Sequence, residues 1–122
     1  MYKRSEKVAE AIHEEISRLL LNGVKDPRVG FVTVTGVKVT DDLRHATVYF
    51  SIIGTDADRK DGEAGLNSAK GFLRREVGKL LRMRYVPEII FRYDESVAYG
   101  SHIESILRQI HETEEDNAEK DK

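Results

Sequence analysis

The fold of this chain can be read from residues 66–84, LNSAKGFLRREVGKLLRMR. One side of a helical wheel through this stretch carries Leu66, Ala69, Leu73, Val77, Leu80, Leu81 and Arg84. This spacing predicts an amphipathic helix. Gly71 interrupts it, and a glycine inside a helix costs about 1 kcal/mol relative to alanine. The stretch therefore predicts a helix pair with a kink or short break at Gly71.

The opposite side of this helix pair is basic. Arg75, Lys79 and Arg82 fall within about 60° of each other on the wheel, because residues three and four apart share a face. Lys70 and Arg74 lie near the kink. Guanidinium groups contact phosphate oxygens in bidentate fashion, and lysine adds a point charge. For a lone helix, a solvated basic face is the commoner explanation of this pattern. The scarcity of balancing acids, with Glu76 alone among these bases, narrows the difference and keeps a nucleic-acid contact open.

Before this stretch, the sequence predicts one helix and a hairpin. Residues 5–22 form an amphipathic helix that ends at a left-handed Asn22-Gly23 stop. Two strands follow at residues 31–40 and 45–53, with a bulge at Gly36, where the alternation changes phase. Residues 54–63 then read as a polar loop leading into the helix pair.

After it, Pro87 opens a third strand, in which Ile89, Phe91 and Tyr93 alternate with Ile90 and Arg92. A capping-box spacing at residues 101–104 starts a short last helix. The order predicts an α+β domain with helices layered on a three-stranded sheet. We assign residues 1–111 to this domain and residues 112–122 to a disordered acidic tail.

Composition limits the class of protein. The chain has 122 residues, no cysteine, no run of about 20 apolar residues and no apolar leader, which together predict a soluble cytoplasmic protein. Its net charge is −2, but residues 112–122 hold six acids and two bases and sum to −4. The body therefore carries −2 minus −4, or +2. The local field, and not the net charge, steers a polyanion.

Catalytic and metal-binding patterns find no support in the sequence. The four histidines are scattered without metal-ligand spacing, and no nucleophile motif is present. Residues 62–65 match the letters of a GxxG loop, but we interpret them as linker because they precede the helix pair. We expect no enzyme activity, no metal and no cofactor.

Eight short motifs, in register over residues 3–111, resemble one family, the bacterial ribosome-binding factor A family. They are Arg4 before the first helix, Asp26-Pro27-Arg28, Val37-x-Val39-Thr40-x-Asp42-Leu43, Ala46-x-Val48-Tyr49, Ala69-Lys70-Gly71-Phe72-Leu73-Arg74, Leu81-Arg82-Met83-Arg84-x-x-Pro87-Glu88, Phe91-x-x-Asp94-x-Ser96 and Gly100-x-x-Ile103.

The resemblance implies a type II KH-like fold, with helices on one face of the sheet and an Ala-x-Gly kink, Ala69 to Gly71, in place of the GxxG loop. It implies binding to free 30S subunits and 16S rRNA near the 5′-terminal helix, and not to 50S or 70S particles. It also implies a role in late maturation and RNA processing that matters most in the cold. A monomer suffices for this role.

We predict that the RNA backbone contacts are Lys70, Arg74, Arg75, Lys79, Arg82 and Arg84, with Lys3, Arg4 and Arg28 as secondary contacts. Arg84 is the least secure, because it lies on the apolar side of the wheel. Three rivals remain: a generic KH-like nucleic-acid binder without a ribosomal target, a small α+β enzyme or ligand sensor, and a purely protein-binding domain, which would need an exposed apolar patch.

Overall fold

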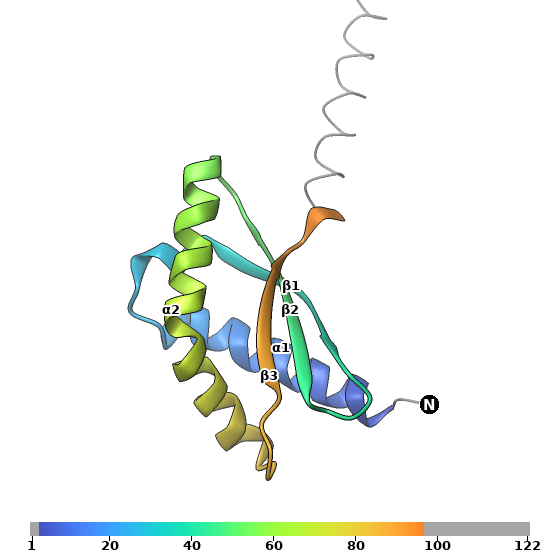
Figure 1. Cartoon of the computed structure of the whole chain (residues 1–122). Helices are drawn as coiled ribbons and strands as arrows, with labels where there is room; N and C mark the ends of the chain where they lie inside the picture. The colour runs from blue at the N-terminus through green and yellow to red at the C-terminus, as the bar shows by residue number, and fades with distance from the viewer. Residues whose placement is uncertain (1–2, 97–122) are drawn as a thin grey trace, which may run out of the picture.

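The computed structural model describes residues 3–96 as two helices and a short 3-10 turn around a three-stranded sheet (Figure 1). The elements in chain order are α1 (Arg4–Asn22), η1 (Pro27–Val29), β1 (Val32–Val39), β2 (His45–Ile52), α2 (Asp56–Leu81) and β3 (Glu88–Tyr93). The expected α+β class, with helices and a three-stranded sheet, is confirmed. The expected last helix, the acidic tail and the domain boundary at residue 111 lie outside the described residues.

The core forms between the helices and one face of the sheet. In α1, Ile12 and Ile16 are fully buried, as the helical spacing predicts. The helix ends at Asn22 as expected, but the left-handed stop is wrong, since Gly23 has a φ of −107°. A Cβ at residue 23 would lie 2.9 Å from the Leu19 side chain, so close packing accounts for this glycine.

β1 and β2 form the expected antiparallel hairpin. Val34 pairs with Phe50 and Gly36 with Tyr49, so the predicted bulge is present between Val34 and Gly36. Ala46, Val48 and Phe50 alternate into the core. This alternation leaves the other face of the sheet uncovered by the helices.

β3 lies beside β2 and runs parallel to it, at the edge of the sheet (Figure 1). His45 pairs with Glu88 and Phe50 with Tyr93. A parallel neighbour needs a long crossover, and α2 supplies it. The crossover brings the start of β2 next to the chain that follows α2.

α2 differs from its prediction at both ends. It begins at Asp56, so residues 56–63 are helical and not a loop. The Thr55 hydroxyl accepts a hydrogen bond from the Asp58 amide, and the Asp58 carboxylate accepts one from the Thr55 amide. This capping box stabilises a first turn that the apolar pattern does not mark.

The middle of α2 also corrects the prediction. The backbone is helical through Gly71, so the expected division into two helices is not seen. Figure 1 shows α2 as one continuous ribbon whose course bends along its length. At the far end the helix stops at Leu81, three residues before the predicted end at Arg84, because Arg82 adopts a left-handed conformation with a φ of 50°.

Candidate nucleic-acid interface

Two adjacent hollows lie where the C-terminal half of α2 meets the start of β2 and the chain entering β3. The first hollow has a volume of about 750 Å³. Its ionisable lining residues are Arg44, His45, Arg74, Arg75, Arg84, Tyr85 and Glu88. Four arginines thus face one carboxylate. A concave surface with this excess of positive charge focuses the field toward an anion.

The second hollow, of about 380 Å³, lies beside the first. Its ionisable lining residues are Arg4, Asp42, Arg44, Arg82, Arg84 and Tyr85. Again four arginines face one carboxylate. Arg44, Arg84 and Tyr85 line both hollows, so they form a shared wall between them.

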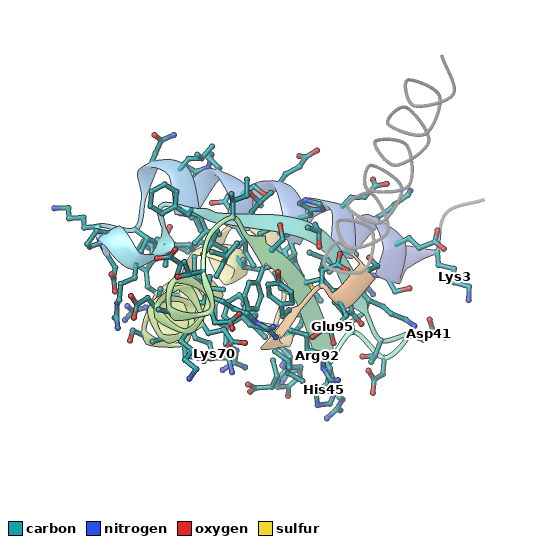
Figure 2. All side chains as sticks on the ribbon, turned by 90° about the horizontal axis from the view of Figure 1, so that it is seen from above. Lys3, Asp41, His45, Lys70, Arg92 and Glu95 are labelled. Atoms are coloured by element: carbon teal, nitrogen blue, oxygen red, sulfur yellow. The ribbon has the colours of Figure 1, made fainter. Side chains whose placement is uncertain are left out.

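The parallel pairing of β2 and β3 creates this wall. The Glu88 amide donates a hydrogen bond of 2.8 Å to the Arg44 carbonyl, just before the two strands pair. Residues 44 and 84–88, far apart in the sequence, therefore meet at one end of the sheet. Figure 2 shows His45 and Lys70 on the side of the molecule that faces away from α1.

Arg74 holds the chain that leads into β3. Its guanidinium donates a hydrogen bond of 3.0 Å to the Val86 carbonyl and lies 3.1 Å from the Glu88 carboxylate. Its Nε is buried without a hydrogen-bond partner among the described residues. The side chain is therefore largely committed to positioning residues 84–88, with part of its charge still facing the first hollow.

Tyr85 is the exposed aromatic residue of the shared wall. The residue is 71% exposed, and the Arg84 guanidinium carbon lies 5.5 Å from the ring centroid. At this separation the cation is attracted by the face of the ring. An exposed aromatic ring among arginines is typical of surfaces that bind nucleic-acid bases.

The second hollow is bordered by two strained turns. Within residues 3–96, the non-glycine residues with positive φ are Leu43 at 62° and Arg82 at 50°, and both line this hollow. Such conformations cost about 1–3 kcal/mol and gather at functional sites. Asp42 holds the first turn through its contacts with the Thr40 hydroxyl and the Arg44 amide, and these hydrogen bonds lower the pKa of its carboxyl.

Five of the predicted contact residues line the hollows. Arg74 and Arg75 line the first, Arg4 and Arg82 the second, and Arg84 both. The placement of Arg84 on a buried side is wrong, because the helix ends before it and the residue is exposed.

The other four predicted residues line neither hollow. Lys79 pairs with Glu76 at 3.2 Å, and Arg82 lies beyond the end of α2, so Arg82 does not continue a helical face with Arg75 and Lys79. Lys70 is half-buried on α2. Lys3 lines a separate hollow together with Asp41, at the end of the molecule where Figure 2 labels both. Arg28 lies at η1.

Arg28 is committed to a local ion pair. Its guanidinium lies 2.6 Å from the Asp26 carboxylate, and this pairing raises the pKa of Arg28 and lowers that of Asp26. Surface pairs of this kind contribute little to stability, and here the pair also occupies the cation. The predicted secondary contact at Arg28 therefore has its charge directed at Asp26.

The kink residues occupy different positions relative to the hollows. Gly71 lines the first hollow, and a Cβ built there meets no heavy atom within 4 Å apart from its own helix and chain neighbours. Ala69 is half-buried and packs against the core. The glycines of the dismissed GxxG letters, Gly62 and Gly65, are buried in α2 and are not linker.

Three basic or aromatic lining residues were missed from the sequence: Arg44, His45 and Tyr85. Tyr85 follows the predicted Arg82 and Arg84 directly, so the aromatic among basic residues was a visible signal. Arg44 and His45 carry no such signal, since they join the site only through the pairing of β2 with β3.

Residues 3–96 hold neither a metal-ligating cluster nor a membrane-spanning helix. No group of three His, Cys, Asp or Glu side chains gathers there as metal ligands would. Neither helix in this range is long and apolar enough to cross a membrane.

Sequence comparisons give a consistent family for this architecture. A family model described as "Ribosome-binding factor A" matches residues 4–107. A ribosome-binding factor A of Geotalea uraniireducens is 64% identical over 121 residues, 99% of each chain. That of Geobacter sulfurreducens is 57% identical over 114 residues, 93% of this chain and 96% of the relative.

Solved structures that carry the same family name have a similar fold. A solution structure of a Thermotoga maritima protein, titled a putative ribosome binding factor A, has a TM-score of 0.56 at 37% identity and covers 72% of this chain and 80% of its own. The crystal structure of ribosome-binding factor A from Thermus thermophilus has a TM-score of 0.55 at 25% identity. The match covers 76% of this chain and 97% of the Thermus chain. A Thermus thermophilus ribosome-binding factor A (RbfA) model, fitted into a map of a 30S–RbfA complex, has a TM-score of 0.53 at 22% identity. The match covers 70% of this chain and 93% of the Thermus chain, and it shows a similar fold.

Proposed function

Because the chain belongs to the ribosome-binding factor A family, we propose that it binds the RNA of free 30S ribosomal subunits through its two basic hollows. Family membership supplies the target. The charge distribution supplies the contact surface, and the Thermus thermophilus relative that was fitted into a map of a 30S complex supports the choice of subunit.

One observation carries the proposal: two neighbouring hollows each present four arginines against one carboxylate. The negative charge of the one carboxylate in each hollow is also partly neutralised by its own contacts. Glu88 is paired with Arg74, and Asp42 accepts hydrogen bonds within its own turn. The net charge of −2 therefore does not describe the surface that meets the RNA.

The finer proposal concerns the RNA and the time of binding. The chain contacts 16S rRNA near its 5′-terminal helix, assists late maturation and processing of the small subunit, and matters most in the cold. It leaves before translation, so it does not accompany 50S or 70S particles. It acts in the cytoplasm as a monomer, by binding alone and without a cofactor.

We further propose that the α+β fold acts as a type II KH-like arrangement. The turn of α2 around Ala69 and Gly71 takes the place of a GxxG loop, because Gly71 leaves an open surface at the first hollow. Shape and phosphate contacts, and not base sequence, provide most of the recognition.

Sedimentation of a lysate that contains tagged full-length chain tests the target. The tag should migrate with free 30S subunits and be absent from 70S fractions. Migration away from ribosomal particles, together with binding to unrelated RNA, would instead establish a general nucleic-acid binder.

A triple variant tests the contact surface: Arg44→Gln, Arg75→Gln and Arg84→Gln. It removes three cations from the hollows and should abolish co-sedimentation. The slope of log affinity against log salt should fall by about 2, taking about 0.7 per phosphate contact on single-stranded RNA. The arginines are exposed, so the variant should stay folded.

A charge-matched control separates the hollows from general attraction. Lys7→Gln, Lys25→Gln and Lys60→Gln remove three exposed cations that line neither hollow. This control should retain most of the binding. Equal losses in the two triple variants would show that the hollows have no special role.

A further inference from the structure

The shared wall of the two hollows points to the form of RNA that binds. We infer that a single strand of RNA runs across the wall, with one base stacked on the Tyr85 ring and its flanking phosphates in the two hollows. This inference rests on the proposed function, because it names the RNA conformation taken by the same site.

The exposed position of Tyr85 supports base stacking on its ring. Its residue is 71% exposed, although burial of an aromatic ring is strongly favourable. It also belongs to both hollows. A ring so placed offers a face to a base between two basic surfaces, and base–aromatic stacking tolerates any base identity.

The arginines on the two sides of the shared wall support the placement of the flanking phosphates. Arg75 lines only the first hollow and Arg82 only the second, while Arg84 lies between them beside the Tyr85 ring. A strand that places a base on the ring has a phosphate on each side of that nucleotide. Cations on both sides of the wall match this spacing, whereas a single patch on one side would not.

The stacking geometry selects a single strand over a duplex. In an A-form helix the bases are stacked on each other, and side chains meet mainly phosphates and 2′-hydroxyls. An aromatic ring can stack only on a base that has left such a stack. The first hollow, at about 750 Å³, is also large enough for the nucleotide next to the stacked base.

The wall is held in place before RNA arrives. Arg74 fixes the carbonyl of Val86, directly after Tyr85, and Arg82 ends α2 in a left-handed turn. Because the backbone on both sides of Tyr85 is already ordered, binding costs less conformational freedom there.

The test measures the affinity of the full chain for an RNA of about 12 nucleotides, single-stranded or annealed to its complement, by fluorescence anisotropy. The wild-type chain should prefer the single strand. Tyr85→Leu should weaken single-strand binding about tenfold, leave duplex binding and the salt slope unchanged, and keep the wild-type unfolding midpoint.

Tyr85→Phe is the matched control, because it keeps the ring and removes the hydroxyl; it should bind like wild type. Equal affinity for both RNA forms, or a folded Tyr85→Leu variant that binds like wild type, would overturn the inference. If the arginine triple variant still loses binding in that case, the proposed function stands. If the wild-type chain binds neither RNA, the proposed function itself fails.

Discussion

Two glycines of α2, Gly71 and Gly78, differ in their surroundings and so predict opposite effects of the same substitution. At Gly71 an added Cβ meets no heavy atom within 4 Å beyond its own helix and chain neighbours. At Gly78 it would lie 2.6 Å from Cγ2 of Val86. Both positions are helical, so Gly→Ala changes the backbone preference in the same direction at each.

At Gly71 the effect of alanine on stability comes from its helix preference, with no steric clash against it. Alanine is about 0.8–1.0 kcal/mol more favourable than glycine inside a helix. Gly71→Ala should therefore raise the free energy of unfolding by about 1 kcal/mol. A glycine that served a non-helical break would give the opposite sign, because alanine would then be strained.

At Gly78 the same gain is opposed by a steric clash. Val86 is branched and stiff at χ1, and its carbonyl is held by Arg74, so it has little freedom to move away. Overpacking costs about 1–3 kcal/mol. Subtracting the helix gain of about 1 kcal/mol leaves Gly78→Ala destabilised by about 0–2 kcal/mol, and Val86→Ala in the same chain should recover much of that loss.

Urea unfolding of the full chain, followed by circular dichroism, measures both effects. With a slope near 2 kcal/mol per M, a change of 1 kcal/mol moves the midpoint by about 0.5 M. Gly71→Ala should raise the midpoint and Gly78→Ala should not. A lower midpoint for Gly71→Ala, or equal increases in both, would refute the reasoning.

Three further predictions address other parts of the fold. Thr55→Ala removes the cap of α2 and should lower stability by about 1 kcal/mol in the same urea assay, whereas Thr55→Ser should not. Leu73→Ala empties a fully buried position and should cost about 2–5 kcal/mol, well above the effect at half-exposed Leu80. The folded pKa of Asp42 is lowered, so its contribution is complete above the unfolded value near 4 and is lost as the pH falls through the folded value; Asp42→Asn should flatten that part of a stability–pH profile.

The sequence could predict the elements whose signals are local. In α1 the helical spacing of Ile12 and Ile16 marks the buried face, and in β2 the alternation of Ala46, Val48 and Phe50 marks the core face. The bulge at Gly36 was also visible, because the alternation changes phase there. Each of these signals needs only neighbours a few residues apart.

The start of α2 could not be found this way. Its first two turns are polar, and their helical structure depends on the cap at Thr55 and on a close contact with the sheet. A Cβ at Gly62 would lie 2.2 Å from the end of the Ile52 side chain, so this glycine lets the helix approach β2. A glycine read alone suggests a loop, and only the tertiary contact reveals a helix.

The arrangement of the cations in the two hollows also could not be predicted from the sequence alone. A helical wheel extended to residue 84 places Arg75, Lys79 and Arg82 on one flat face. The helix ends at Leu81 with a left-handed Arg82, so Arg82 and Arg84 leave the wheel and turn toward β2, where Arg44 completes the wall. A flat row of cations suits a phosphate backbone of any conformation, whereas two hollows separated by an exposed ring distinguish an unpaired strand from a duplex. In the proposed mode of binding, the end of one helix therefore determines which form of RNA this surface prefers.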